Sequence, residues 1–288
     1  MSENFLIIGG DLRNIMLAKS MTKDGNIVYT YGLEKSEEIK ELKKSIQFNN
    51  LQDAVESSNI IIGPTPFTKD EININTPFSE KQILIKELIQ KIKNKTLIAG
   101  SIKQNVYDLA SENNVKIIDF MKKEEVAILN AISTVEGAIE IIIKNTDKIL
   151  HGSNILILGF GRIGKVLAKK LSGLSANITC AARKKEDFAW ITAYGYKTTN
   201  INLLKENLSQ YDIIINTVPH MVLTKERLNY VKKDCLIIDL ASKPGGIDQK
   251  VAEEKGIKSI WALALPGKVA PFTTAEIIKK AIYDSSQP

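Results

Sequence analysis

Short apolar runs alternate with amphipathic stretches along the first 120 residues. Short runs at residues 5–8, 26–30, 60–62, 96–99 and 116–119 predict five strands. Apolar residues spaced for one helix face predict helices over residues 12–21, 51–57, 79–92 and 104–113, and the polar stretch at residues 66–79 predicts an exposed loop. This half therefore predicts a flavodoxin-like or Rossmann-like domain.

The same alternation returns after one long, proline-free helical pattern over residues 121–150. Beyond it, strands are expected at residues 155–158, 177–182, 211–216, 235–239 and 259–262, and helices at residues 184–194, 203–208, 224–231, 249–255 and 273–283. The predicted fold class is α/β, with two Rossmann-like doubly wound parallel-sheet domains joined by long bridging helices. The expected substrate domain comprises residues 1–125 with the C-terminal helix 272–288, and a bridging helix at 126–150 leads to a nucleotide domain at 151–271. The substrate is expected in the cleft between the two domains.

A glycine-rich turn follows the first strand of the second half. Gly159, Gly161 and Gly164 stand at G-x-G-x-x-G spacing between a predicted strand and a predicted helix. That order predicts a dinucleotide site whose pyrophosphate lies at the helix N-terminus, with Phe160, Arg162 and Ile163 completing the turn. A purely structural tight turn is the alternative. The earlier turn Gly9-Gly10-Asp11 lacks the third spaced glycine and predicts no full phosphate cradle.

The end of the next strand, Ala182-Arg183-Lys184, bears on the identity of the dinucleotide. NAD enzymes carry an acidic residue there for the ribose hydroxyls, whereas here the first carboxylate is Glu186. The guanidinium of Arg183 suits a 2′-phosphate, so the sequence favours NADP over NAD. The alternative is that these cations form a solvated turn.

Other strand ends supply candidate contacts to nicotinamide and substrate. The expected cofactor contacts are Thr217, Val218, Pro219, Ala241, Ser242, Pro266 and Gly267. His220 is a candidate proton donor, although a loop histidine is more often simply solvated, and His151 fits a helix cap better. Arg13, Thr65, Ser101, Lys103, Lys243 and Lys268 are candidates for an anionic substrate, and for Arg13 a salt bridge is an equal alternative. The sequence predicts no metal site.

Composition narrows the class of protein further. The net charge is +6, but the cations are dispersed lysines with only four arginines, so nucleic-acid binding is not expected. Cys180 and Cys235 fall in apolar strands, as free thiols of a reducing compartment do. No signal peptide or apolar run approaching a membrane span is recognised, which predicts a cytoplasmic protein without a membrane partner.

Several segments together resemble the family of the dipicolinate synthase A subunit and, more distantly, alanine dehydrogenase and the D-2-hydroxyacid dehydrogenases. They include Gly9-Gly10-Asp11-x-Arg13, Asn130-Ala131-x-x-Thr134-x-Glu136-Gly137-Ala138, His151-Gly152-Ser153, Asn216-Thr217-x-Pro219, Asp239-Leu240-Ala241-Ser242-x-Pro244-Gly245-Gly246 and Leu265-Pro266-Gly267-x-x-Ala270-Pro271. His220 departs from the family pattern, in which a small residue is expected.

The resemblance implies NAD(P)-dependent oxidation of dihydrodipicolinate, a lysine-pathway intermediate, to dipicolinate in the mother cell of a sporulating bacterium. It also implies a flavoprotein-like partner, the dipicolinate synthase B subunit, and a small dicarboxylate substrate. Two alternatives stay open: a stand-alone amino-acid or 2-hydroxyacid dehydrogenase, and a nucleotide-binding scaffold that is inactive without its partner. The sequence also leaves open whether the chain forms a homo-oligomer.

Overall fold

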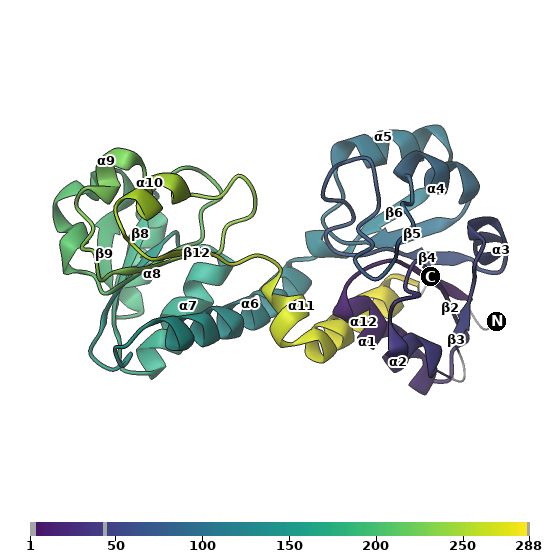
Figure 1. Cartoon of the computed structure of the whole chain (residues 1–288), viewed down its shortest axis with the longest axis horizontal. Helices are drawn as coiled ribbons and strands as arrows, with labels where there is room; N and C mark the ends of the chain where they lie inside the picture. Colours follow the sequence, from purple (N-terminus) through teal and green to yellow (C-terminus); the bar gives the residue numbers. More distant parts are fainter. Residues whose placement is uncertain (1–3, 43–44, 287–288) are drawn as a thin grey trace. The chain divides into compact units, whose positions relative to one another are not determined.

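The computed structural model describes residues 4–42 and 45–286, which fold into two compact units. The first unit is Met1–Asn130 with Ala270–Pro288, and the second is Ala131–Val269. Each contains a six-stranded sheet in which every strand pairing is parallel (Figure 1). The predicted fold class, two Rossmann-like doubly wound α/β sheets, is confirmed.

The first sheet has the strand order β3-β2-β1-β4-β5-β6. The order reverses between β1 and β4, the topological switch point where such sheets place their ligands. Its elements are β1 Phe5–Ile8, α1 Leu12–Lys23, β2 Val28–Tyr31, α2 Glu37–Lys40, β3 Ser45–Gln47, α3 Leu51–Glu56, β4 Ile60–Ile62, α4 Ile85–Lys91, β5 Thr96–Ala99, α5 Gln104–Glu112, β6 Lys116–Asp119, the 3₁₀ turn Phe120–Lys122 and the terminal helix α12 Pro271–Ser286.

The second sheet repeats this order as β9-β8-β7-β10-β11-β12. The corresponding switch point lies between β7 and β10. Its elements are α6 Glu124–Asn145, which begins in the first unit, β7 Asn154–Leu158, α7 Arg162–Gly173, β8 Asn177–Ala182, α8 Lys185–Ala193, β9 Lys197–Asn200, the 3₁₀ turns Ile201–Leu203 and Lys205–Gln210, β10 Ile213–Asn216, α9 Lys225–Leu228, β11 Leu236–Asp239, α10 Gln249–Glu254, β12 Ser259–Trp261 and α11 Leu265–Val269.

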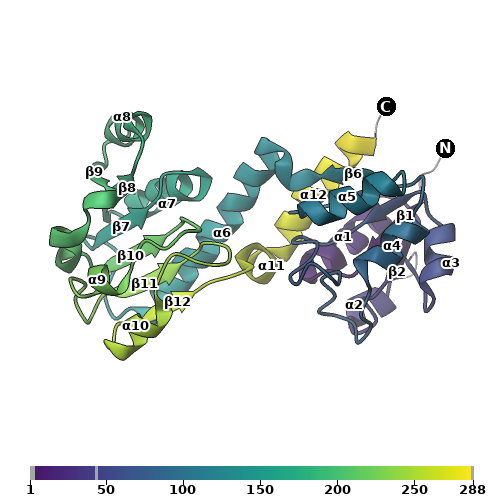
Figure 2. The same cartoon turned by 90° about the horizontal axis from the view of Figure 1, so that it is seen from above.

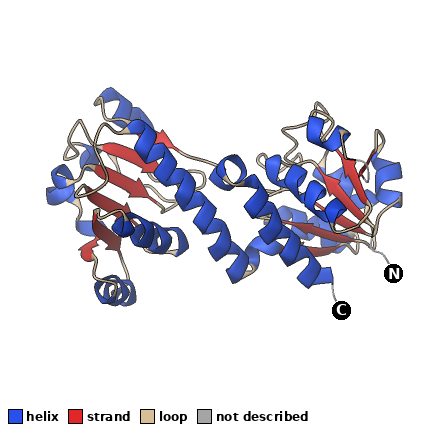
Figure 3. Ribbon diagram, turned by 90° about the horizontal axis from the view of Figure 1, so that it is seen from below, coloured by secondary structure: helices blue, strands red, loops and turns tan. Residues whose placement is uncertain are grey.

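Helices cover both faces of each sheet (Figure 3). In β7, Ile155 and Ile157 belong to one apolar core with residues of α6 and α7, whereas Leu156 and Leu158 belong to another with residues of α9 and α10. Successive strand residues point to opposite faces, so a strand covered on both sides must be apolar throughout. This explains why the central strands could be recognised as continuous apolar runs.

The C-terminal helix α12 completes the core of the first unit and lies beside α1 (Figure 2). Its residues Ala275, Ile278 and Ile282 are buried in the same apolar core as Ile15 of α1. Lys279 adds an ion pair to Asp24 at 2.9 Å, just beyond the end of α1. The final helix was predicted at residues 273–283 and runs somewhat further in both directions.

Two edge strands were missed by the sequence prediction. β3 (Ser45–Gln47) borders the first sheet and β9 (Lys197–Asn200) borders the second. Neither contains a fully buried residue. Edge strands are covered on fewer sides than central ones, so their sequences lack the apolar run that marks a central strand. The first sheet therefore has six strands instead of the predicted five.

The helix predicted over residues 79–92 is wrong in its first half, because only Ile85–Lys91 is helical. Residues 72–74 form backbone hydrogen bonds with 83–85, Ile74 N to Ile83 O at 2.9 Å and Ile85 N to Ile72 O at 3.0 Å, which hold that stretch extended. The loop at residues 66–79 was predicted to be exposed, yet Phe67 and Ile74 are buried in the core.

The long helix predicted over residues 121–150 is shorter and interrupted at its start. Lys123 has an extended backbone between the 3₁₀ turn and α6, and α6 ends at Asn145. By length and composition α6 could cross a membrane, so the expectation that no segment approaches a membrane span is wrong on that criterion. Half of the apolar window is buried, and Val135, Ala138 and Ile142 of α6 lie in the core of the second unit.

Candidate nucleotide and strand-end site

The turn between β7 and α7 has the geometry that a pyrophosphate requires. A methyl group built on Gly161 would have no heavy atom within 4 Å, so its backbone is open to a ligand. Gly161 is the N-cap of the 12-residue helix α7, and no side chain among the described residues makes a cap hydrogen bond there. The first-turn N–H groups and the positive end of the helix dipole therefore remain suited to phosphate oxygens.

The two flanking glycines are required by packing. A methyl group on Gly164 would lie 2.2 Å from the carbonyl oxygen of Gly159, so only glycine lets the first turn of α7 approach β7. Gly159 has a φ of +96°, and a methyl group there would lie 2.5 Å from Thr217 Oγ1. Phe160 is buried in the core, whereas Arg162 is exposed and Ile163 partly buried. The three glycines thus have separate roles: turn, open backbone and close packing.

The corresponding turn of the first unit is filled by its own side chains. Asp11 caps α1, and both of its carboxylate oxygens accept hydrogen bonds from the Arg13 guanidinium, at 2.9 and 2.8 Å. Arg13 is 5% exposed and also donates to the carbonyl oxygen of Thr65. A negative charge already occupies this helix N-terminus, so the turn is not an equivalent phosphate site.

A buried amide–carboxylate pair joins the ends of β10 and β11. Asn216 donates from Nδ2 to Asp239 Oδ1 at 2.8 Å, and the two residues are 0% and 1% exposed. Asp239 also accepts from the backbone N–H of Ala241 at 3.0 Å and of Gly246 at 2.8 Å. Its two oxygens therefore fix both ends of the loop that follows β11.

Asn216 holds the neighbouring loop in the same way. Its Nδ2 donates to the Val218 carbonyl at 2.9 Å, and its Oδ1 accepts from the Val218 N–H at 3.1 Å. Thr217 Oγ1 donates to the Leu158 carbonyl at 2.9 Å, next to Gly159. The structure thereby brings Gly159, Thr217 and Val218 together at the switch point, as expected of strand-end residues in this fold.

The remaining predicted strand-end contacts of the second unit differ in exposure. Pro219, His220, Ser242 and Lys243 are exposed, whereas Ala241 is buried and its carbonyl accepts from Trp261 Nε1 at 2.8 Å. Pro266 and Gly267 are buried within helix α11 instead of lying in an open strand-end loop. At the end of β8, Ala182 is buried, Arg183 is exposed, and Lys184 pairs with Glu186 at 3.1 Å.

The carboxyl edge of the first sheet holds the other candidates. Thr65 is buried and Ser101 is exposed, with a φ of +56°. Asp119, at the end of β6, accepts from the backbone N–H groups of Ser101 at 3.0 Å and Ile102 at 2.9 Å. Lys103 is exposed, with its Nζ 4.0 Å from Glu71 Oε1. The structure therefore joins Arg13 to Thr65 and leaves the Ser101 and Lys103 side chains open to solvent.

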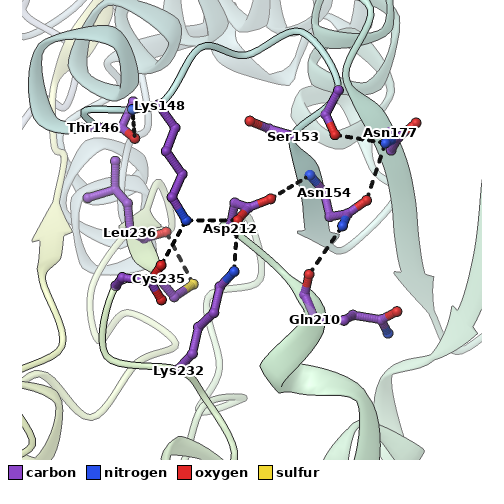
Figure 4. Close-up of polar contacts among 12 residues, drawn as sticks. Thr146, Lys148, Ser153, Asn154, Asn177, Gln210, Asp212, Lys232, Cys235 and Leu236 are labelled. Carbon is purple, nitrogen blue, oxygen red and sulfur yellow. Dashed lines mark hydrogen bonds and ion pairs between the residues drawn. The ribbon is translucent and has the colours of Figure 1, made fainter.

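A charged cluster lies at the opposite, amino-terminal edge of the second sheet (Figure 4). Asp212 accepts from Lys148 at 3.0 Å and from Lys232 at 2.7 Å, and Lys148 also contacts Asp234 at 2.8 Å. Burial acts to raise the pKa of Asp212, but hydrogen bonds from Lys232, the Asn154 N–H and Lys148 outweigh it and hold the pKa below its ordinary value. This cluster ties the strand starts together and is a stabilising feature.

The sequence analysis included Asp11, Asn216 and Asp239 in motif segments but assigned no role to them, and it did not single out Asp119. Asn216, Asp239 and Asp119 share a signal, since each is the polar last residue of a strand and directly follows two or three isoleucines, in the runs IIIN, LIID and KIID. A buried polar group needs a partner, and adjacent parallel strands bring their last residues together. The register pairs Asn216 directly with Asp239.

Each half of the chain matches the model of a known protein family. Residues 4–121 match the family model for the N-terminal domain of the dipicolinate synthase A subunit. Residues 140–261, which hold the glycine turn and the Asn216–Asp239 pair, match the shikimate / quinate 5-dehydrogenase family model.

Individual relatives cover nearly the whole chain. The dipicolinate synthase A subunit of Bacillus subtilis (strain 168) is 32% identical over 278 residues, covering 96% of this chain and 93% of that protein. The crystal structure of the dipicolinate synthase A subunit from Bacillus halodurans superposes with a TM-score of 0.90 at 28% identity, covering 100% of this chain and 99% of that one. An L-alanine dehydrogenase structure shares the fold, with a TM-score of 0.61 at 13% identity, covering 97% of this chain and 88% of its own.

Proposed function

Because this chain belongs to the family of the dipicolinate synthase A subunit, whose members are NAD(P)-dependent oxidoreductases, we propose that it oxidises dihydrodipicolinate to pyridine-2,6-dicarboxylate during sporulation. The observation that carries this proposal is the likeness to that protein along nearly the entire chain. The open glycine turn in the dehydrogenase-like half supports the nicotinamide cofactor, which the family match already indicates.

We propose NADP as the preferred cofactor, held along residues 159–164. At the end of β8 the guanidinium of Arg183 is exposed, and within the described residues it pairs with no carboxylate. Lys184 is already paired with Glu186, so Arg183 is the better candidate for a 2′-phosphate. The strand-end residues 217–219, 241–242 and 266–267 are the proposed contacts to the rest of the dinucleotide.

The reaction removes a hydride and a proton from the dihydropyridine ring. When bound, the oxidised nicotinamide supplies the hydride acceptor. The chain's contribution is to orient the reactants, because aromatisation of the ring favours the reaction and no strong nucleophile is needed. Asn216 and Asp239 serve this purpose by fixing the loops that carry Val218 and Ala241.

A dianionic substrate also needs cations. Lys243, after β11, and Lys103, after β5, are both exposed, and each is proposed as a candidate contact for a substrate carboxylate. Arg13 is fully engaged by Asp11 and Thr65, so we propose that it positions the Thr65 loop and that Thr65 and Ser101 offer neutral contacts. The sequence suggested His220 as a proton donor, but oxidation of the ring releases a proton, so we propose the exposed His220 at the carboxyl edge of the second sheet as a proton acceptor instead.

The family is named for the A subunit of an enzyme, which implies a partner, and we propose that this partner is the flavoprotein-like B subunit. We further propose that the chain works in the mother-cell cytoplasm, where its buried free thiols, Cys180 and Cys235, suit reducing conditions.

The decisive experiment incubates the purified chain with dihydrodipicolinate and NADP⁺ and records the absorbance of pyridine-2,6-dicarboxylate, with and without the B subunit. Product formation by the chain alone supports a self-sufficient enzyme, whereas activity only in the presence of its partner supports a scaffold role. The absence of product in both mixtures, with NADP⁺ and with NAD⁺, would refute the proposed reaction.

The cofactor preference has its own test. Arg183→Ala should weaken NADP⁺ binding by about tenfold, the loss of one charge-assisted contact to phosphate, and leave NAD⁺ binding within about twofold. Lys185→Ala, at the exposed first residue of α8, is the matched control and should affect both cofactors little. Equal losses of NADP⁺ and NAD⁺ affinity in Arg183→Ala would contradict the 2′-phosphate role.

A further inference from the structure

Trp261 ends the edge strand β12 and lies in register with the buried pair of the strand-end site. The strand pairings place Asn216 beside Asp239 and Asp239 beside Trp261, so the three side chains follow one another across β10, β11 and β12 on one face of the sheet. Asn216 and Asp239 each hydrogen-bond the backbone of a loop that follows a strand. Trp261 is the third member of this row, and the roles proposed for the strand ends do not include it.

The indole of Trp261 contacts both ends of the loop that follows β11. Its Nε1 donates to the carbonyl oxygen of Ala241 at 2.8 Å. At the other end of the loop, a methyl group built on Gly245 would lie 3.1 Å from Cζ2 of the indole, and Gly245 has a φ of +84°. A side chain at position 245 would strain the backbone and press on the ring, so glycine is favoured there. Trp261 and Asp239 thus fix the same loop through two separate sets of contacts.

The base of this loop is fixed, whereas the side chains at its tip are free. Ala241 and Gly245 are buried, and the Gly245 N–H donates to the Ser242 carbonyl at 2.8 Å, which closes the tip. Ser242 and Lys243 are exposed, and in the described part of the chain neither the Ser242 hydroxyl nor the Lys243 ammonium has a hydrogen-bond or ion-pair partner. An anion that binds such a tip does not have to order the backbone first, which favours affinity.

We propose that Trp261 is a positioning residue of the strand-end site. By fixing the loop that follows β11, it holds the backbone of Ser242 and Lys243 in the place from which Lys243 contacts a substrate carboxylate. The inference rests on the proposed function for that contact, and it adds the residue on which the contact depends. Trp261 acts through the loop and not on the reacting atoms.

The indole N–H is the part of Trp261 that a smaller aromatic ring cannot replace. Phenylalanine keeps an apolar ring beside Gly245 but leaves the Ala241 carbonyl without its donor. Ala241 is 3% exposed, so water replaces that donor poorly. Trp261→Phe should therefore loosen the loop at Ala241 while keeping most of the packing.

The test measures binding of pyridine-2,6-dicarboxylate to the full chain by calorimetric titration, which requires no turnover. The parent should bind with a dissociation constant on the order of 1 mM or tighter, the affinity that a ligand of this size can reach. Lys243→Met should weaken binding about tenfold by removing a charge-assisted contact. Trp261→Phe should weaken it about fivefold by removing the hydrogen bond that fixes the loop. Trp190→Phe, the same change at the other of the two tryptophans, which is exposed on α8, is the matched control and should leave binding unchanged.

The double variant, Lys243→Met with Trp261→Phe, separates positioning from a general structural effect. If Trp261 acts through Lys243, adding Trp261→Phe to Lys243→Met should weaken binding by no more than about a further twofold. Independent effects would multiply to a loss of about 50-fold and would overturn the proposal. Unchanged binding in Trp261→Phe would also overturn it, as would no binding by the parent up to about 50 mM ligand, well beyond the expected affinity.

Thermal melting verifies that each variant is folded before its affinity is compared. Trp261→Tyr, which also keeps a ring and lacks the indole N–H, takes the place of Trp261→Phe in the same comparison if the phenylalanine variant does not fold. The expected and the contradicting outcomes are the same for both variants.

These outcomes are separable from those of the proposed reaction. Coupled effects of Lys243→Met and Trp261→Phe on binding, in a chain that forms no pyridine-2,6-dicarboxylate from dihydrodipicolinate, would refute the reaction and leave the positioning role supported. Product formation by a chain in which the two substitutions act independently would refute the positioning role and leave the reaction supported.

Discussion

Replacing Asp239 by asparagine removes a charge from the centre of the strand-end site with almost no change in shape. Asp239 Oδ1 accepts from Asn216 Nδ2 and from the Ala241 N–H, and Oδ2 accepts from the Gly246 N–H. Asparagine offers one carbonyl oxygen, so its NH₂ group must face at least one of these donors. Asn216 cannot compensate by flipping, because both ends of its amide bond Val218.

The expected cost follows from that unsatisfied donor. A buried N–H without an acceptor costs about 1–3 kcal/mol, and the remaining hydrogen bonds lose their charge assistance. A neutral amide is cheaper to bury than a carboxylate, which offsets part of that second loss. We therefore expect Asp239→Asn to lower the unfolding free energy of the second unit by about 2 kcal/mol.

Tryptophan fluorescence in urea measures this change directly, because Trp190 and Trp261 both belong to the second unit. With a urea dependence of about 2 kcal/mol per molar, the midpoint should fall by about 1 M. NADP⁺ affinity should fall as well, since the loop carrying Ala241 loses its fixed position.

Asp248→Asn is the matched control for this experiment. Asp248 caps α10 by accepting from the Val251 N–H at 3.1 Å, and asparagine caps helices as well as aspartate does. Its stability should stay within about 0.5 kcal/mol of the parent. If Asp239→Asn were equally silent, the Asn216–Asp239 pair would not be what holds the strand-end loops.

Three further predictions concern the second unit. Gly161→Ala should change the unfolding free energy by no more than about 1 kcal/mol yet weaken cofactor binding more than tenfold, whereas Gly164→Ala should lower the unfolding free energy by about 2 kcal/mol or more. Urea unfolding and NADP⁺ titration measure the two effects. A reversed pattern would contradict the assigned roles. The native pKa of Asp212 lies below its unfolded value of about 4, so the stability that Asp212 contributes is complete above that pH and is lost as the pH falls further. Asp212→Asn should therefore flatten the acid limb of the stability–pH curve. An unchanged limb would contradict a stabilising role for the Asp212 cluster. Burial raises the pKa of Cys180 and of Cys235 to about 12, so neither thiol should react with Ellman's reagent at neutral pH until urea is added, and rapid native labelling would argue against their burial.

An element could be predicted from the sequence only where its own residues form a distinctive local pattern. The strand β7 and its glycine turn were identified because a buried parallel strand and three spaced glycines leave few alternatives. The edge strand β9, with the sequence KTTN, carries no such mark. Residues 79–84 have helical spacing, but backbone hydrogen bonds between residues 72–74 and 83–85 hold the end of that stretch extended. No local pattern encodes those contacts.

The same distinction applies to the candidate site. Residues of the glycine turn were found from local spacing, whereas Asn216 and Asp239 work as a pair that depends on strand register, which is a tertiary property. Arg13 illustrates the converse. Its position after β1 fitted a substrate contact and a salt bridge equally well, and the structure shows the salt bridge, to the carboxylate of Asp11 two residues away.

The packing of α12 against α1 has a consequence for protein synthesis. On the ribosome, every residue of the second unit emerges before α12 does, so the first unit waits for its closing helix although most of it is made first. Until then the apolar surface around Ile15 and Met21 lacks its cover and is a target for chaperones and proteases. The second unit can therefore complete its fold before the first, although the first is mostly translated earlier. A nonsense mutation just before residue 271 would leave the second unit intact and the first without its last helix.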